Sequence, residues 1–362
     1  MTDPIRVGIG GLGRSGFAIH SEYLKDDPRF QVVAAADPLP ERRRDAAERF
    51  GCRVYEDYAA MLSAGGFDLF VNATPSRFHV TASLAGLVAG FHVLSEKPSA
   101  TTVAEFDRIV SAARSAGREF FPFQNSRYYP CFRKIREVIA SGVLGEIICI
   151  RSNWSGFARR WDWQTLQSEC GGNLWNTGPH PVDQAVVLFG EAEPNVFCRM
   201  ASRHFDLGGD ADNFCALTLY GEGHPTIEIQ ISSFQVWPQG EQYNIQGTCG
   251  GLCGGANGLK WKYFDPAHAP KHEPWRPWSF NRQYCSEQLE WQEQSWQFVT
   301  PLSGEESFRM LSAGVYSNLY EVLRNGAPRE ITLAQVRRQI GIMEEAHRQN
   351  PLPRRNGEEA AQ

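Results

Sequence analysis

The sequence predicts an α/β fold: an N-terminal, doubly wound parallel sheet and a C-terminal α+β domain whose open sheet is mainly antiparallel. In the first 122 residues, short β-branched runs alternate with helical patterns, as in proteins built from βαβ units. Beyond residue 122, longer segments of alternating polar and apolar residues follow one another. The 362 residues suffice for two domains, since one domain commonly takes about 100 to 200.

The N-terminal elements, residues 1–122, are predicted from buried strands and from helical patterns that end at glycine. Strands are expected at residues 5–9, 31–36, 68–71 and 92–95, and helices at 78–90 and 103–117. Strands joined by helices form right-handed crossovers, so the sheet should be parallel.

The C-terminal domain is predicted to span residues 123–350, with a polar tail at 351–362. It begins with a helix at 130–141 that stops at Gly142, and it ends with a helix at 332–347. Between them lie strands at 146–153, 213–219, 226–232 and 241–247.

Composition excludes several classes of partner. The net charge of -5 gives no basic surplus for nucleic acid. No run of about 18 apolar residues is present, and the N-terminus lacks a secretory pattern, so we expect a cytoplasmic protein without membrane contact. Only Cys249 and Cys253 lie close together, with no histidine nearby, so no metal site is expected.

A glycine-rich turn directly after the first strand predicts a dinucleotide site. In GIGGLG, Gly8 permits the turn, Gly10 lets the backbone approach a pyrophosphate, and Gly13 lets helix pack on strand. The phosphates would lie at the helix N-terminus. The same loop contributes Gly11, Leu12 and Arg14 to the predicted cofactor contacts.

Asp37, at the end of the second strand, is placed to bind the adenosine ribose. A carboxylate accepts two hydroxyl bonds and repels a 2′-phosphate, which favours NAD. The arginines at 42–44 leave NADP possible, or they form a solvated helix face.

Two further strand ends should face the cofactor, because ligands of such sheets collect at the carboxyl edge. They supply Thr74 and Pro75, then Glu96 and Lys97. His79 follows at a helix start, where a cofactor contact and a packing role are both open.

Together the motifs GIGGLG, ADP, ATPSRFH, SEKP, FQNSRYYP and GGNLWNTGPHPVDQ resemble the glucose-fructose oxidoreductase, inositol dehydrogenase and rhizopine-catabolism (Gfo/Idh/MocA) family. The resemblance implies a Rossmann domain, a C-terminal open sheet, and NAD(P)-linked chemistry on sugars or cyclitols. It also implies a homodimer or homotetramer assembled through that sheet.

The resemblance assigns roles to particular residues. Lys97 would lie beside nicotinamide and substrate, His180 would be the acid/base, and Asn125 would lie near the nicotinamide end. Asn176 stands where the family's motif has an inner aspartate.

Alcohol oxidation explains these residue types, because a hydride leaves to NAD and a proton leaves to a base. His180, between two prolines at a predicted helix start, can be that base, and Lys97 can stabilise alkoxide charge. The helix dipole and Lys97 should keep the ring neutral. Asn176 positions without adding charge, while Asp183 either compensates or is a first-turn helix charge.

Further side chains are candidates for substrate contact. Arg127 and Tyr128 either reach substrate or anchor the domain boundary, and Trp154, Arg160 and Trp163 offer aromatic and polar faces to a sugar ring. We expect an NAD-dependent oxidoreductase that interconverts a ring alcohol and ketone. A redox-neutral, glycoside-cleaving enzyme with tightly bound NAD and a non-catalytic NAD or sugar sensor remain alternatives.

Overall fold

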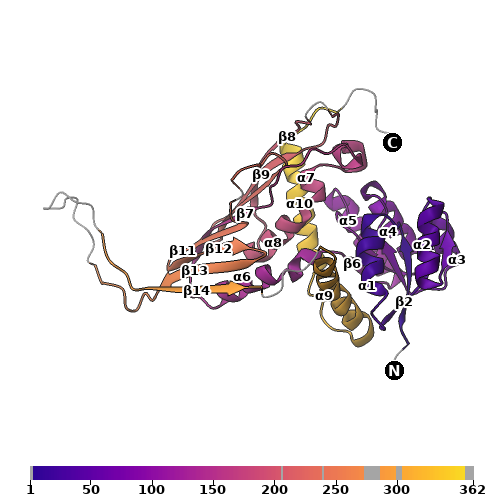
Figure 1. The fold of residues 1–362 in the computed structure, drawn as a ribbon, viewed down its shortest axis with the longest axis horizontal. Helices are drawn as coiled ribbons and strands as arrows, with labels where there is room; N and C mark the ends of the chain where they lie inside the picture. Colours follow the sequence, from indigo (N-terminus) through magenta and orange to yellow (C-terminus); the bar gives the residue numbers. More distant parts are fainter. Residues whose placement is uncertain (1–2, 205–206, 239, 273–285, 299–303, 355–362) are drawn as a thin grey trace.

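The computed structural model describes residues 3–204, 207–238, 240–272, 286–298 and 304–354. Two sheets form two lobes side by side, with the last two helices between them (Figure 1). Both predicted sheet types are present, so the fold class is confirmed.

The N-terminal sheet has six strands in the order β3-β2-β1-β4-β5-β6, and all its pairs are parallel. The strands are β1 (Ile5–Gly10), β2 (Phe30–Ala36), β3 (Arg53–Tyr55), β4 (Leu69–Asn72), β5 (His92–Ser95) and β6 (Phe120–Pro122). The strand order reverses at β1, between β2 and β4, which is the switch point where such sheets bind nucleotides.

Helices cover both faces of this sheet. They are the π-helical turn η1 (Gly16–Ser21), α1 (Glu22–Leu24), α2 (Pro40–Phe50), α3 (Tyr58–Ala64), the 3₁₀ turn η2 (Ser76–Phe78), α4 (His79–Val88) and α5 (Val103–Ala116). Helix α5 begins at a capping box of Thr102 and Glu105 and ends at Gly117 in the left-handed region, which explains its predicted limits.

The C-terminal sheet has eight strands in the order β14-β13-β12-β11-β7-β10-β9-β8. They are β7 (Ile147–Asn153), β8 (Asn195–Ala201), β9 (Phe214–Tyr220), β10 (Thr226–Ser232), β11 (Tyr243–Gly247), β12 (Gly250–Gly255), β13 (Gly258–Phe264) and β14 (Trp291–Gln297). β7 and β10 pair in parallel and the other pairs are antiparallel. The sequence patterns did not predict β8, β12, β13 or β14.

The remaining elements connect the lobes or cover the second sheet. They are η3 (Asn125–Tyr128), α6 (Pro130–Ala140), η4 (Trp163–Thr165), η5 (Gln167–Glu169), α7 (Asn173–Asn176), α8 (Pro179–Phe189), α9 (Gly304–Asn325) and α10 (Leu333–Gln349). The predicted helices at 130–141 and 332–347 are confirmed as α6 and α10, and Thr332 caps α10 through its side chain.

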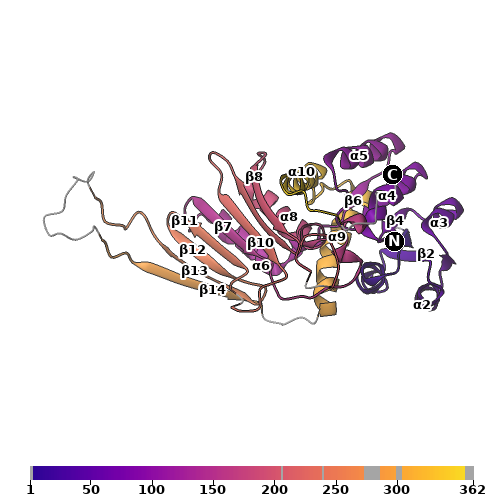
Figure 2. The same cartoon turned by 90° about the horizontal axis from the view of Figure 1, so that it is seen from above.

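Helix α9, which was not predicted, packs on the N-terminal lobe although it lies late in the chain (Figure 2). Its Leu311, Val315 and Tyr316 are buried with Ile5 and Phe30 in the core of the parallel sheet. A helix from the C-terminal part of the chain therefore completes the N-terminal core, and it places Tyr316 inside that core.

Three other expectations concern absences and the tail. In the described ranges, no helix is both long and apolar enough to cross a bilayer. No group of three His, Cys, Asp or Glu side chains in these ranges could hold a metal ion. Residues 355–362 of the predicted tail lie outside the described residues.

Candidate active site

The glycine-rich loop leaves no room for a side chain at two positions where β1 turns into η1, Gly11 and Gly16. Gly11 has φ +90°, and a Cβ there would overlap the carbonyl of Ala73. A Cβ at Gly16 would overlap the carbonyl of Gly11, whereas one at Gly13 would find only Arg42, 3.8 Å away. The close helix–strand approach that the sequence suggested for Gly13 is therefore made by Gly16.

Asp37 lies against this loop and is 3% exposed. Its Oδ2 accepts the amide of Leu12 at 2.8 Å, and its Oδ1 accepts the amide of Leu39 at 3.0 Å. Arg42 approaches Oδ2 at 3.3 Å, while Arg43 donates to the Asp37 carbonyl at 2.8 Å. Of the three arginines at positions 42–44, Arg42 is the one whose guanidinium is paired with this carboxylate.

His79 ties the two neighbouring strand ends together. Its Nδ1 lies 2.8 Å from the carbonyl oxygen of Pro98, and its Nε2 lies 2.8 Å from that of Thr74. Burial lowers the pKa of His79, although the Pro98 carbonyl opposes this shift. Both ring nitrogens face the protein's own backbone, so the packing role suits His79 better than the predicted cofactor contact.

Lys97 projects from the carboxyl end of β5 toward the C-terminal lobe. Its Nζ donates to the backbone carbonyl of Asn176 at 2.7 Å, across the boundary between the lobes. Burial lowers the pKa of Lys97, the charge of Glu96 raises it, and the charges of Arg14 and Arg160 lower it further. The net result is a half-buried ammonium that loses its proton more easily than a solvated one.

His180 lies in the first turn of α8, as predicted. Burial and then the charge of Lys97 lower its pKa to about 3, so the ring is neutral at pH 7. The pKa shift has the predicted direction, but its largest cause is burial, whereas the sequence had suggested the helix dipole and Lys97. Its Nδ1 is buried without a hydrogen-bond partner among the described residues. The ring of Trp154 stacks on it, with centroids 6.0 Å apart and planes 21° apart.

Asn176 acts on Lys97 through its main chain, while its side-chain nitrogen lies 3.5 Å from the carbonyl of Gln164. The segment before it is fixed by Asp212, which is buried and accepts the amide of Leu174 at 2.9 Å. Burial raises the pKa of Asp212 to about 7, despite hydrogen bonds from backbone amides. Gly172 has φ +107°, and a Cβ there would overlap this carboxylate.

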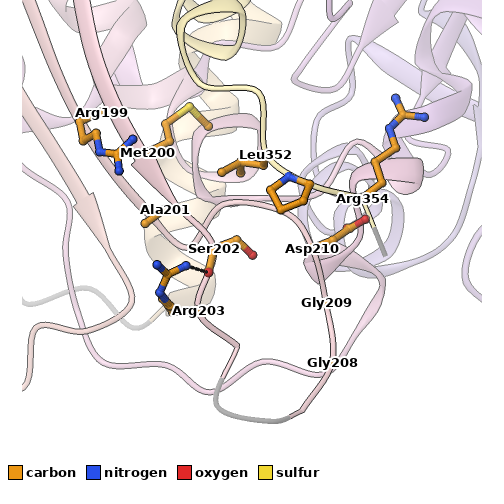
Figure 3. Close-up of a pocket in the computed structure, with 11 residues that line it drawn as sticks. Arg199, Met200, Ala201, Ser202, Arg203, Gly208, Gly209, Asp210, Leu352 and Arg354 are labelled. Atoms are coloured by element: carbon orange, nitrogen blue, oxygen red, sulfur yellow. Dashed lines mark hydrogen bonds between the residues drawn. The ribbon is translucent and has the colours of Figure 1, made fainter. Parts of the chain in front are cut away.

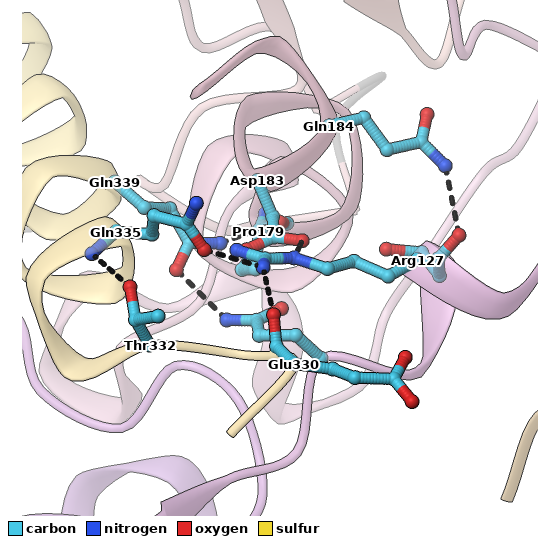
Figure 4. Close-up of polar contacts among 10 residues, drawn as sticks. Arg127, Pro179, Asp183, Gln184, Glu330, Thr332, Gln335 and Gln339 are labelled. Carbon is cyan, nitrogen blue, oxygen red and sulfur yellow. Dashed lines mark hydrogen bonds and ion pairs between the residues drawn. The ribbon is translucent and has the colours of Figure 1, made fainter. Parts of the chain in front are cut away.

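Arg127 and Asp183 form a buried ion pair between η3 and α8 (Figure 4). Arg127 donates from Nε and Nη2 to the two carboxylate oxygens at 2.7 and 2.8 Å. Its Nη1 donates to the Glu330 carbonyl and to Gln335, at 3.0 and 2.6 Å. This network favours the anchoring alternative for Arg127. It also engages Asp183 with Arg127, which does not favour a compensating role at His180.

Tyr128 also packs inside the protein. It is 5% exposed, its ring contacts Gly314 of α9, and the Arg133 guanidinium lies 4.8 Å from the ring centroid. The predicted substrate contact of Tyr128 is therefore not supported. Asn125, in the same turn, is buried.

The other predicted substrate contacts lie on the segment after β7. Trp154 contacts His180, as described above. Arg160 is exposed and pairs with Asp162 at 2.7 Å, yet its charge still acts on Lys97. Trp163 is 39% exposed and opens the turn that carries Gln164.

Two residues behind Lys97 were not predicted from the sequence. His20 and Tyr316 are fully buried, with His20 Nδ1 2.8 Å from the Tyr316 hydroxyl. No local signal identified them, because each lies inside a helix and the two are 296 positions apart.

Two surface hollows lie away from Lys97 and His180. The larger, about 450 Å³, lies beside β8 and is lined in part by Arg199, Arg203 and Arg354 (Figure 3). The other, about 340 Å³, lies near the start of β5 and includes His92 and Arg118.

The fold and the residues around Lys97 and His180 define a class: a two-domain protein with a dinucleotide-binding Rossmann domain and a sheet domain that closes its carboxyl edge. The family model described as "Oxidoreductase family, NAD-binding Rossmann fold" matches residues 5–123. The model described as "GFO/IDH/MocA C-terminal domain" matches residues 132–253. The chain belongs to the Gfo/Idh/MocA family.

Named relatives include D-glucoside 3-dehydrogenase of Escherichia coli (strain K12), 30% identical over 52% of this chain and 55% of that protein. An NADP⁺-dependent scyllo-inositol 2-dehydrogenase of Bacillus subtilis (strain 168) is 27% identical over 68% of this chain and 67% of that protein. The match spans only 52% to 55% of the length of the first three curated relatives.

Solved structures share the fold over nearly the whole chain. An NAD-binding protein from Listeria innocua has a TM-score of 0.77 at 22% identity, covering 98% of this chain and 100% of that chain. The WlbA dehydrogenase of Bordetella pertussis, in complex with NADH and UDP-GlcNAcA, has a TM-score of 0.73 at 22% identity, covering 96% and 97%.

Proposed function

We propose that this protein is an NAD-dependent oxidoreductase that interconverts a secondary alcohol and a ketone on the ring of a sugar, a sugar derivative or a cyclitol. The observation that carries the proposal is the meeting of Lys97 and His180, which come from different lobes. Lys97 reaches the carbonyl of Asn176 at 2.7 Å, and its charge acts on His180. Relatives named for glucoside and inositol dehydrogenation support the substrate class.

The residues present fit a dinucleotide. At Gly11 and Gly16 a Cβ would overlap the protein's own carbonyls, so glycine lets the loop turn tightly into the helix, while the space beside Gly13 is open. Such a turn can present backbone amides to a pyrophosphate. Asp37, beside this loop, would hold the ribose hydroxyls, and Thr74, Pro75 and Asn125 would lie along the carboxyl edge of the sheet. NAD, when bound, supplies the hydride acceptor.

This chain's own residues would handle the proton and the oxygen. Neutral His180 can take the proton of the substrate hydroxyl, since it has a buried nitrogen without a partner in the described part of the chain. The ammonium of Lys97 can donate to the same oxygen and stabilise its developing negative charge. Trp154, which stacks on His180, would contact one face of the substrate's sugar or cyclitol ring.

The preference for NAD over NADP rests on Asp37. Its carboxylate lies at the end of β2, against the glycine-rich loop, and it would repel a 2′-phosphate. Arg42, 3.3 Å from that carboxylate, is the group through which NADP could still be accepted.

The test is turnover of a sugar and cyclitol panel with NAD and with NADP, followed by NADH or NADPH absorbance and product analysis. Lys97→Ala and His180→Ala should each lower kcat by about 100-fold or more, because a positioned acid/base group contributes about that factor. Trp161→Phe is the control, since Trp161 is 79% exposed. Wild-type turnover in both alanine variants would refute the assigned roles.

One observation favours a second candidate, a redox-neutral enzyme that cleaves or rearranges glycosides through a transient keto sugar. Asn176 replaces the carboxylate expected near His180, and Asp183 is engaged by Arg127. Neither position therefore supplies a carboxylate to His180, and the negative charge that raises the pKa of the ring is that of Glu96, behind Lys97. Cleavage of a glycoside without accumulation of NADH would select this candidate over the simple dehydrogenase.

A homodimer or homotetramer through the C-terminal sheet belongs to the same proposal. One face of that sheet packs on α6, α8 and α10, while the other leaves Phe197 62% and Tyr220 47% exposed. A monomeric mass in solution, with Phe197→Lys no different from wild type, would contradict this assembly.

A further inference from the structure

The carboxylate of Glu96 points into the protein, behind Lys97. Glu96 follows β5 directly and is 4% exposed. Its Oε2 accepts the backbone amide of Lys97 at 3.1 Å, and its Oε1 lies 3.3 Å from Nε2 of His20. The predicted cofactor contact of Glu96 is thus replaced by contacts with the interior side of the lysine loop.

His20 is held in place from the other side by α9. Its Nδ1 lies 2.8 Å from the Tyr316 hydroxyl, and the ring of Phe123 lies 4.6 Å from its own. Tyr316 in turn stacks on Tyr23, with centroids 4.9 Å apart. If the phenol donates to Nδ1, the ring proton lies on Nε2 and faces Glu96.

The position of His20 in the π-helical turn η1 is part of this geometry. Single π-helical turns redirect side chains and occur often at functional sites. Three segments that are remote in the sequence therefore converge on one carboxylate.

The charge of Glu96 acts on both residues of the proposed reaction. Burial alone would raise the pKa of Glu96, but the contact with His20 and the charge of Lys97 outweigh it and lower the pKa to about 2. Glu96 is the described neighbour whose charge raises the pKa of Lys97 and of His180.

The other charged groups of the described residues that act on Lys97 lower its pKa. Arg14, at the start of the first helix, and Arg160, after β7, both lower its pKa, as burial does. An ionised Glu96 is therefore what maintains the ammonium against these influences.

We propose that His20 and Tyr316 are positioning residues that hold Glu96 as a carboxylate against the amide of Lys97, so that its charge keeps the half-buried Lys97 in the ammonium form. Their effect on catalysis rests on the function proposed above, in which that ammonium stabilises the substrate oxygen. Neither His20 nor Tyr316 touches substrate in this scheme, because both are fully buried.

The experiment measures the protonation of Lys97 directly and does not need turnover. The rate of acylation of each of the six lysines by acetic anhydride is followed against pH by peptide mass spectrometry. In Glu96→Gln, which removes the carboxylate charge, the midpoint for Lys97 should fall by about one pH unit. In His20→Gln, the carboxylate remains but loses the contact that holds it in place, so the midpoint should fall in the same direction by a smaller amount. The pKa that describes the alkaline limb of the pH profile of kcat/KM should fall by the same amount in each variant.

His92→Gln is the matched control. His92 lies at the opposite end of β5 and accepts the amide of Glu119 at 3.0 Å, so its loss removes a partly buried imidazole on the same strand. This control should leave the Lys97 midpoint where it is in the wild type.

Glu96→Gln and Tyr316→Phe keep the inference falsifiable if His20→Gln does not fold. Glu96→Gln should lower the Lys97 midpoint most, and Tyr316→Phe should lower it by less than His20→Gln, because it leaves His20 in place. An unchanged midpoint in folded His20→Gln or Glu96→Gln overturns the inference. A wild-type protein that oxidises no substrate, but whose Lys97 midpoint still moves in these variants, refutes only the proposed function.

Discussion

Replacing Asp183 with asparagine tests whether Arg127 is a structural anchor. Asp183 is fully buried, and the Arg127 side chain is 7% exposed and donates to it at 2.7 and 2.8 Å. Asp183→Asn keeps the shape of the side chain but leaves the guanidinium buried without its counter-charge. Removal of one partner from such a pair costs about 3 to 5 kcal/mol in the free energy of unfolding.

The assay is urea denaturation followed by tryptophan fluorescence. All ten tryptophans lie at or after Trp154, so the signal reports the C-terminal lobe that holds Asp183. With an m-value of about 3 kcal/mol/M, the cost corresponds to a fall of about 1 to 2 M in the urea midpoint.

The double variant Arg127→Met/Asp183→Leu supplies the control. Because it removes both charges, it should recover most of the stability that Asp183→Asn loses. It should also retain the wild-type KM for a validated substrate. A stable Asp183→Asn would show that the anchor assignment is wrong. A stable double variant whose KM rises at least tenfold would show that Arg127 serves substrate binding.

Two other predictions concern buried groups near the site. Asp212 has a pKa of about 7 in the folded protein against 3.8 for an ordinary aspartate, so the stability that its protonation contributes is full below about pH 4 and lost as the pH rises through 7. Asp212→Asn should therefore gain stability relative to wild type as the pH increases from 4 to 8, measured by denaturation at each pH. A difference in stability that does not change with pH would contradict the raised pKa of Asp212. Gly16→Ala should abolish NAD binding or folding, measured by calorimetry and circular dichroism, because its methyl group overlaps the loop carbonyl. Gly13→Ala should fold normally, since its methyl group meets nothing closer than 3.8 Å; equal behaviour of the two variants would refute this distinction.

Much of the architecture could be predicted because its signals are local. Buried β-branched runs located four strands of the parallel sheet, and helical apolar spacing that ends at Gly117 gave the limits of α5. The same local chemistry placed His180 in the first turn of α8. Short or highly exposed strands were not predicted. β3 has three residues, and six of the seven residues of β14 are exposed, so neither carries a clear hydrophobic period.

The candidate site was predicted only in part, because the partners of its charged groups are distant in sequence. Arg127 and Asp183 are 56 positions apart, and nothing local indicates that they neutralise each other. His79 looked equally suited to cofactor and packing until both its nitrogens were found against backbone carbonyls.

The sequence by itself determined the order of the domains, the nucleotide loop, and the presence of Lys97 and His180 at element ends, because glycine conformation, capping and burial periodicity act over a few residues. Only the tertiary structure decided which charges meet. It assigned Arg127 to Asp183, turned Glu96 toward His20, and brought Tyr316 of α9 into the core of the cofactor domain. Electrostatic interactions depend on distance and burial in space, and these are fixed only when segments far apart in the chain pack together.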